Sequence, residues 1–240
     1  MSRQLVSANE AASFILEAHR GNRPPGATLC GISGIDASGK GYVSNLIVEQ
    51  LCAKGVHAVN LGVDGWLNLP HVRFNADNPA EHFYLHAIRF EEMFEQLVLP
   101  LRDNRSHQAV VDYTEETATA YRKQEYCFRN VDVIVLEGVF LLSRAYRHWF
   151  DVSIWVDCGF ETALERALAR GQEGLTSDET IRAYQTIYFP AQRIHFLRDD
   201  PRAAADAVFR NDSRLSSAPE PRPNNVLERK LPALSAKSRA

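Results

Sequence analysis

The stretch GISGIDASGKGYVSN, residues 31–45, decides how the rest of the chain is interpreted. Gly34, Gly39 and Lys40 have the spacing G-x-x-x-x-G-K of a phosphate-binding loop. Glycines in such a loop let backbone N–H groups curl around phosphate oxygens, and the lysine reaches the outer phosphates. Gly41 stands where a Ser or Thr normally follows the lysine. The stretch therefore predicts a nucleotide-phosphate site that lacks one hydroxyl.

The segments on either side of the loop support this interpretation. Residues 27–33, ATLCGIS, form an apolar run typical of a buried strand, and residues 40–55 place apolar side chains at helical spacing. The positive end of that helix would face the phosphates. The predicted contacts to ATP, or another nucleoside triphosphate, are Gly34, Ile35, Asp36, Ala37, Ser38, Gly39, Lys40, Gly41 and Tyr42.

Composition bounds the class of protein. The 240 residues are 45% hydrophobic and 24% charged with a net charge of −3, which is typical of one globular domain and gives no sign of nucleic-acid binding. No apolar run approaches the roughly 20 residues that cross a membrane. The four cysteines are scattered, as expected for reduced thiols in a cytoplasmic protein. The oligomeric state is left open, a homo-oligomer included.

Three parts of the chain are predicted. Residues 1–26 contain a helix over 8–20, opened by the capping box of Ser7 and Glu10, and then a linker. Residues 27–212 form the main domain. Residues 213–240 are rich in Ser, Pro and Ala and are predicted to be a disordered tail.

The main domain alternates strands and helices, which predicts an α/β fold of three layers with a mainly parallel five-stranded sheet. Expected helices include 79–104, 161–171 and 179–198, the last broken near Pro190. Residues 115–130 are expected to be irregular, and residues 204–212 to supply a helix end and one last strand. The expected strands cover residues 27–33, 57–63, 108–113, 131–138 and 152–158.

Further segments follow the phosphate loop in a familiar order. They are VDGW (63–66), NPAEHFYLHAIRFEEMFEQLVLPL (78–101), DVIVLEGVFLL (132–142), FDVSIWVDCGFETALERALAR (150–170) and AYQTIYFPAQRIHFLRDDPRAAADAVFRND (183–212). In this order they resemble the uridine kinase-like branch of P-loop small-molecule kinases, which includes phosphoribulokinase- and pantothenate kinase-like enzymes. The resemblance implies the P-loop NTPase fold with a short lid.

The resemblance also implies roles for individual residues. Asp64 is similar to the family's catalytic carboxylate, and Lys40 would act on the transferring phosphate. Glu137 matches the second acidic position, so Asp64 and Glu137 are the implied Mg²⁺ ligands. Arg166 and Arg170 fall on the helix that enters the lid, although the family pattern R-R-x-x-R-D is incomplete here.

The acceptor side departs from the pyrimidine nucleoside kinases. Val111 and Glu116 stand where that group carries a Tyr and a His, which weakens uridine or cytidine as the acceptor. Asp112 is retained and is a candidate for binding a sugar hydroxyl. Further candidate substrate contacts are Tyr84, His82 and Arg89.

The missing hydroxyl at Gly41 removes one Mg²⁺ ligand, but Mg²⁺ tolerates several waters, so the loop is still expected to bind nucleotide. We therefore predict an ATP-dependent phosphotransferase that phosphorylates a hydroxyl of a small metabolite. Two alternatives stay open. One is a transferase similar to nucleoside-monophosphate kinases, because Asp36 has a counterpart in the thymidylate kinase loop. The other is a nucleotide-binding regulator without turnover.

Overall fold

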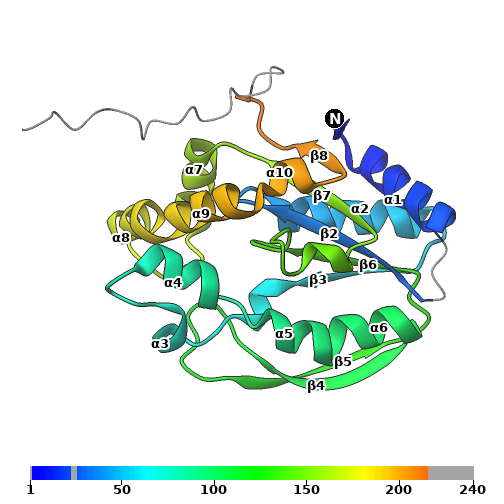
Figure 1. Cartoon of the computed structure of the whole chain (residues 1–240), viewed down its shortest axis with the longest axis horizontal. Coiled ribbons are helices and arrows are strands. Elements are labelled where there is room, and N and C mark those ends of the chain that lie inside the picture. Colours follow the sequence, from blue (N-terminus) through cyan, green and yellow to red (C-terminus); the bar gives the residue numbers. More distant parts are fainter. Residues whose placement is uncertain (1, 23–25, 216–240) are drawn as a thin grey trace, which may run out of the picture.

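The computed structural model describes residues 2–22 and 26–215. Within them a six-stranded, wholly parallel sheet forms the centre of the molecule (Figure 1). The strands, in spatial order, are β1 (Arg3–Leu5), β8 (Ala207–Arg210), β7 (Val152–Asp157), β2 (Thr28–Gly34), β6 (Val133–Gly138) and β3 (Ala58–Gly62). Because all six run the same way, their carboxyl ends meet at one edge of the sheet, where ligands bind in open α/β folds.

Helices cover both faces of this sheet, so the predicted three-layer α/β architecture is confirmed (Figure 1). On β6, Val133 and Val135 face the core shared with the first two helices, whereas Ile134 and Leu136 face the opposite core. This burial on both faces explains why the strand is apolar almost throughout. The helices on the first face are α1 (Ala8–Asn22) and α2 (Lys40–Ala53).

The remaining helical elements belong to the other face and to the carboxyl edge. No helix of the described residues has the length and apolar character needed to cross a membrane. The elements are η1 (Val63–Trp66), α3 (Pro70–Arg73), α4 (Pro79–His86), α5 (Phe90–Met93), η2 (Phe94–Val98), α6 (Leu99–Asn104), η3 (Arg147–Trp149), α7 (Phe160–Arg170), α8 (Ser177–Ala183), η4 (Tyr184–Tyr188), α9 (Phe189–Asp199) and α10 (Pro201–Ala204).

The sheet has six strands rather than the five predicted. The strand expected at 108–113 lies outside it, while β1 and β8 extend the opposite edge. The three residues of β1 are too short for a periodic pattern, and their extended conformation comes from pairing with β8. The predicted linker and tail boundaries stay predictions, and residues 216–240 of the expected disordered tail lie outside the described residues.

The prediction for residues 108–130 was wrong in arrangement. β4 (His107–Tyr113) pairs antiparallel with β5 (Arg122–Phe128), so the two form a separate hairpin. β5 falls in the segment expected to be irregular, because its sequence, RKQEYCF, is largely polar. Its strand conformation comes from cross-strand partners, such as Asp112 opposite Lys123, rather than from local propensity.

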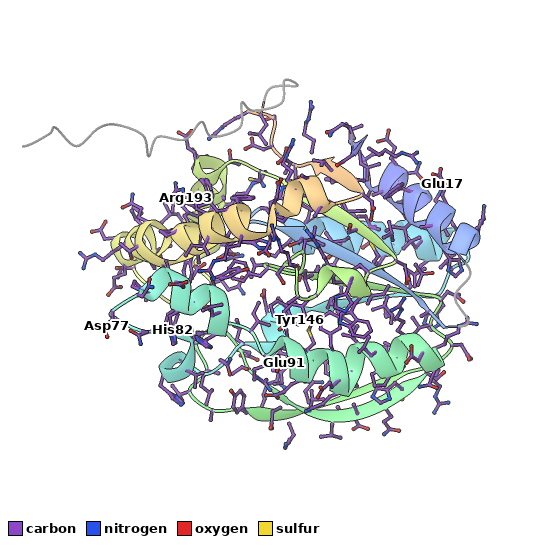
Figure 2. The ribbon with its side chains drawn as sticks, viewed as in Figure 1. Glu17, Asp77, His82, Glu91, Tyr146 and Arg193 are labelled. Atoms are coloured by element: carbon purple, nitrogen blue, oxygen red, sulfur yellow. The ribbon has the colours of Figure 1, made fainter. Side chains whose placement is uncertain are left out.

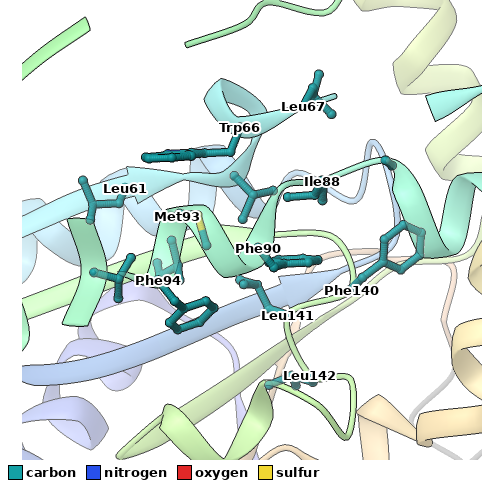
Figure 3. Close-up of a cluster of buried hydrophobic side chains, with 14 of the residues drawn as sticks. Leu61, Trp66, Leu67, Ile88, Phe90, Met93, Phe94, Phe140, Leu141 and Leu142 are labelled. Atoms are coloured by element: carbon teal, nitrogen blue, oxygen red, sulfur yellow. The ribbon is translucent and has the colours of Figure 1, made fainter. Parts of the chain in front are cut away.

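The long helix predicted over 79–104 is interrupted at residues 87–89. Ile88 forms an antiparallel bridge with Leu67, and Arg89 N–H donates to the Trp66 carbonyl at 2.9 Å. These backbone bonds replace the helical ones. Figure 3 shows the consequence: one buried cluster contains Trp66 and Leu67, then Ile88, Phe90, Met93 and Phe94, and finally Phe140, Leu141 and Leu142.

The break predicted near Pro190 is replaced by a π turn. Residues 177–199 stay helical through α8, η4 and α9, and η4 ends just before Pro190. The same arrangement precedes Pro100, where η2 adjoins α6. Proline offers no N–H to the ladder, and the wider π turn accommodates that loss without breaking the helix.

Candidate active site

The phosphate loop connects β2 to α2 at the carboxyl edge of the sheet. Gly34 ends the strand, and a Cβ there would lie 2.7 Å from Ser38 Oγ, so a side chain would collide with the loop itself. Gly39, directly before α2, has φ +85°, and a Cβ there would lie 2.5 Å from Asn211 Nδ2. Two of the motif glycines are therefore required by packing and by conformation.

The loop is held in place by three distant segments. The Ser38 carbonyl accepts hydrogen bonds from Arg166 Nη1 on α7 at 2.9 Å and from Asn211 Nδ2 at 2.7 Å. Asp36 N–H donates to Gln192 Oε1 on α9 at 3.1 Å. Arg166 also donates to the Asn211 carbonyl at 2.8 Å. Its guanidinium thus joins the loop to the end of β8.

Lys40 is a buried cation at the start of α2. Its side chain is only 7% exposed, yet within the described residues its ammonium makes no ion pair. Glu137, near the end of β6, interacts with it electrostatically. Burial raises the pKa of Glu137 to about 7; Lys40 lowers it, and Asp64 and Asp36 raise it further. Lys40 therefore has charge available for an anionic ligand at the loop.

The space beside Gly41 is bounded by Glu137. A Cβ at Gly41 would lie 3.7 Å from Glu137 Oε1, which is an ordinary contact, so a small side chain fits. Ser44 Oγ, one turn further along α2, donates to the Gly41 carbonyl at 2.9 Å and accepts from Asn60 Nδ2 at 2.9 Å. The Ser44 hydroxyl therefore has partners of its own and does not replace the missing one.

An open cleft lies next to the loop. Asp64, carried by η1 directly after β3, lies on its wall. Four carboxylates, one guanidinium, two amides and four apolar or aromatic side chains line it: Asp36, Asp64, Glu116, Glu173, Arg170, Gln172, Gln192, Leu67, Phe83, Val139 and Tyr188.

Arg170 lies among acids in this cleft. Its Nη2 is 2.8 Å from Glu173 Oε1 and 3.8 Å from Asp36 Oδ1. The Tyr184 hydroxyl lies 2.9 Å from Glu173 Oε1 and 3.1 Å from Asp36 Oδ2. Burial, with Asp36 and Glu173 nearby, raises the pKa of Tyr184, so the hydroxyl keeps its proton. A single proton cannot serve both carboxylates, and Arg170 compensates the remaining negative charge.

Glu116 also lines the cleft. Its Oε1 lies 3.6 Å from Nη2 of Arg73, a buried side chain on α3. Burial raises the pKa of Glu116 to about 7; Arg73 lowers it, and Asp36 and Asp64 raise it. The carboxyl group thus lies within the field of the other acids of the cleft.

The structure brings together some of the predicted site residues. The phosphate loop, Lys40, Asp64, Glu137 and Arg170 gather at the carboxyl edge. Tyr42, at the start of α2, is 69% exposed. Arg166 is nearby, but its hydrogen-bond partners among the described residues are Ser38 of the loop, Cys158 and Asn211.

The four predicted acceptor contacts have other surroundings, and none of them is among the described residues that line the cleft. The Asp112 carboxylate pairs with Lys123 at 2.8 Å across the hairpin. The Tyr84 hydroxyl donates to Asp199 at 2.5 Å. His82, labelled on α4 in Figure 2, has its Nε2 2.7 Å from the Val72 carbonyl.

Arg89, the fourth of these residues, is a buried cross-link. It donates to the Asp112 carbonyl at 2.6 Å and pairs with Glu92 at 2.7 Å. Its guanidinium also lies 4.5 Å from the centre of the Tyr121 ring. These bonds join α5 to the β4–β5 hairpin, so Arg89 is held by neighbouring elements of the fold and not by residues of the cleft.

Sequence reasoning missed several residues of the cleft. Glu173 lies three residues beyond the last residue of α7, and Tyr188 and Gln192 lie on the helical segment around Pro190. An acid two residues after the Gly171 helix stop was the one available signal, because Arg170, a predicted site residue, directly precedes that stop. Tyr188 and Gln192 give no comparable signal.

Comparisons with known proteins agree with this geometry. The model of the Phosphoribulokinase / Uridine kinase family matches residues 29–187. Uridine kinases of Staphylococcus epidermidis and Staphylococcus aureus are 29% and 30% identical over 170 and 167 residues, which cover 68% of this chain and 78% of each relative.

Solved structures share the fold. A possible uridine kinase from Bacillus stearothermophilus superposes with a TM-score of 0.65 at 22% identity, covering 83% of this chain and 97% of the other. D-glycerate 3-kinase from Cryptococcus neoformans has a TM-score of 0.55 at 11% identity, with 81% and 89% covered. At these identities the likeness concerns the fold.

Proposed function

Because the chain belongs to the phosphoribulokinase/uridine kinase family and is a P-loop kinase, we propose that it transfers the γ-phosphoryl group of ATP to a hydroxyl of a small metabolite. The observation that carries this proposal is the buried Lys40 ammonium, which has no ion pair among the described residues and lies at a phosphate loop beside an acid-lined cleft. The loop supplies the donor end and the cleft the acceptor end.

The donor end fits a nucleotide. The loop backbone, the N-terminus of α2 and Lys40 supply N–H groups and positive charge for the β- and γ-phosphates. Ser38 Oγ is buried and has no hydrogen-bond partner in the described part of the chain, so the loop retains an unused donor. Arg170 stabilises charge on the transferring group from the cleft side.

The acceptor end uses Asp64. Its carboxylate accepts the proton of the acceptor hydroxyl as that oxygen bonds to the γ-phosphorus and the bond to the ADP oxygen breaks. The position of Asp64, at the carboxyl edge and on the cleft wall, supports this role. Water is displaced from Leu67, Phe83 and Tyr188 when an acceptor fills the cleft.

The residues present also fit a magnesium ion. In the described part of the chain no group of three or more His, Cys, Asp or Glu side chains could hold a metal ion by itself. Mg²⁺ bound with nucleotide commonly uses one or two carboxylates together with phosphate oxygens and water, and Asp64 and Glu137 would provide those carboxylates. When bound, Mg²⁺ neutralises charge on the phosphate oxygens.

Acceptor-dependent ADP formation tests this function. Purified protein, ATP and Mg²⁺ are combined with a panel of nucleosides, nucleoside monophosphates, sugars and vitamin-like alcohols. We expect ADP to form with a subset of alcohols. ADP formation only with nucleoside monophosphates would favour a transferase similar to nucleoside-monophosphate kinases. Nucleotide binding without any acceptor-dependent ADP would favour a nucleotide-binding regulator without turnover.

A further inference from the structure

The charges on the wall of the cleft are unbalanced. Four carboxylates line it and one guanidinium faces them, so the lining carries three more negative than positive formal charges. Arg170 is shared between Glu173 and Asp36, and Glu116 has Arg73 at 3.6 Å outside the lining, whereas Asp64 makes no ion pair among the described residues.

One carboxylate oxygen in this wall is left without a partner. Glu173 Oε1 has Arg170 and Tyr184 within 2.9 Å, but its Oε2 is buried and makes no hydrogen bond among the described residues. The residue as a whole is only 9% exposed. A buried carboxylate oxygen without a donor is costly unless a ligand supplies one. The ligand that fits is a hydrogen-bond donor rather than an acceptor.

The apolar part of the cleft is aromatic. Phe83 and Tyr188 both line it, and their ring centres are 5.0 Å apart in an edge-to-face arrangement. Aromatic faces attract cations and repel anions, independently of the carboxylates. The two features of the wall therefore favour the same sign of ligand charge.

From these features we propose that the acceptor is a cationic alcohol, a small molecule that carries a protonated amine near the hydroxyl to be phosphorylated. This inference rests on the proposed kinase function, because it names the class of acceptor for the same cleft. The ammonium group lies against Glu116 and the Glu173 side of the cleft, while the hydroxyl faces Asp64. Acceptors that already carry a phosphate or carboxylate are excluded by repulsion from the carboxylate wall.

Arg73 does not reverse this charge selection. It is buried and is absent from the described residues that line the cleft, and its Nη2 faces Glu116. Its Nε and Nη1 are buried and have no hydrogen-bond partner among the described residues. Arg73 therefore acts on the ligand through Glu116.

Equilibrium binding of matched ligands tests the proposal. Each series contains one neutral, one amine-bearing and one acidic member of the same skeleton, for example glucose, glucosamine and glucuronate, or a nucleoside, its aminodeoxy analogue and its 5′-phosphate. Binding is measured with and without a non-hydrolysable ATP analogue. We expect the amine-bearing member of at least one series to bind about tenfold more tightly than its neutral counterpart.

Glu116→Gln is the variant that assigns the preference to the cleft, and Glu115→Gln is its matched control, since Glu115 is exposed and pairs with Arg122. The first should reduce the preference for the amine severalfold, and the second should leave it unchanged. The proposal is overturned if a neutral or acidic member binds best, if Glu116→Gln keeps the full preference, or if no member of any series binds.

The same ligands separate this proposal from the kinase function. Preferential binding of the amine-bearing member without ADP formation would contradict phosphoryl transfer but support the charge selection. ADP formation with neutral or acidic alcohols alone would support the kinase and overturn the cationic acceptor.

Discussion

The two ends of the cleft are built in different ways. The donor end is one continuous segment, residues 34–42, whose conformation follows from glycines and from the start of α2. The acceptor end combines side chains from η1, the loop that follows β4, the loop after α7, and α9. One continuous segment can therefore encode a phosphate site, whereas the residues that line the cleft come together only after folding. Substitutions at the two ends should accordingly have different effects.

The largest effect is expected at the donor end. Lys40→Ala removes the buried ammonium at the loop and should weaken nucleotide binding and lower turnover by about 10³-fold or more, because charge on the transferring phosphate loses its main side-chain partner. ATP titration and acceptor-dependent ADP formation measure both quantities. Lys54→Ala, an exposed lysine at the end of the same helix, is the matched control and should behave as wild type. Unchanged ATP affinity in Lys40→Ala contradicts the phosphate-loop assignment.

Asp64→Asn should impair the acceptor end of the cleft and leave the donor end intact. Losing a positioned base should lower kcat by about 10²-fold or more, while nucleotide affinity stays close to wild type. The substitution is nearly isosteric, so thermal stability should also be retained. Turnover near the wild-type value with the true acceptor would reduce Asp64 to a residue of the turn after β3.

The two arginines of α7 should differ in kind. Arg166→Ala removes the bonds to the Ser38 and Asn211 carbonyls, and should lower the free energy of unfolding by about 1.5–3 kcal/mol and weaken ATP binding. Arg170→Ala should lower kcat more than ATP affinity, because Arg170 faces the cleft. Denaturant unfolding and nucleotide titration distinguish them. Identical profiles for both variants would argue against separate roles.

Tyr84→Phe tests whether a predicted substrate contact is structural. The Tyr84 hydroxyl donates to Asp199, which also bonds His195 at 2.7 Å. We expect a loss of about 1–2 kcal/mol in the free energy of unfolding and no change in KM for the acceptor. A raised KM with unchanged stability would return Tyr84 to the substrate site.

The hydrogen bonds to Asp199 also make stability depend on pH in the acid range. Burial alone would raise the pKa of Asp199, but hydrogen bonds from His195, Tyr84 and Arg144 N–H outweigh it and lower the pKa to about 2. The associated stability is present above the unfolded-state pKa of about 4 and is lost as the pH falls through about 2. The deficit of Tyr84→Phe relative to wild type should therefore shrink below about pH 4.

The smallest effect is expected at Gly41. Gly41→Ser places a hydroxyl beside Glu137 in space that accepts a Cβ, and exchanging one water for a direct ligand is worth about 1 kcal/mol. Nucleotide binding in Mg²⁺ should tighten a few fold, with little change in kcat. Gly41→Ala is the matched control, because it adds the Cβ without the hydroxyl. Nucleotide binding by Gly41→Ser that is equal to or weaker than wild type would contradict the idea that a water takes the place of the missing hydroxyl.

Features that depend on local sequence were predicted correctly, whereas features that depend on distant partners were not. The alternation of strands and helices predicted the parallel sheet, and the spacing of Gly34, Gly39 and Lys40 predicted the loop, because both depend on local patterns. The β4–β5 hairpin was misassigned because β5 depends on its partner strand. Glu173 was missed because its place in the cleft is set by tertiary packing. Arg89 was predicted to contact substrate, but its bonds run to the hairpin and to Glu92.

The central claim is that this cleft transfers phosphate from ATP to an alcohol. The most direct measurement incubates wild-type protein and Asp64→Asn with ATP labelled in the γ-phosphoryl group and with the acceptor panel, then separates the products. We expect label in a phosphate ester of an acceptor with the wild type, and we expect the Asp64→Asn variant to form this ester about 10²-fold more slowly. Label found only in ATP and inorganic phosphate, whichever acceptor is present, would contradict it.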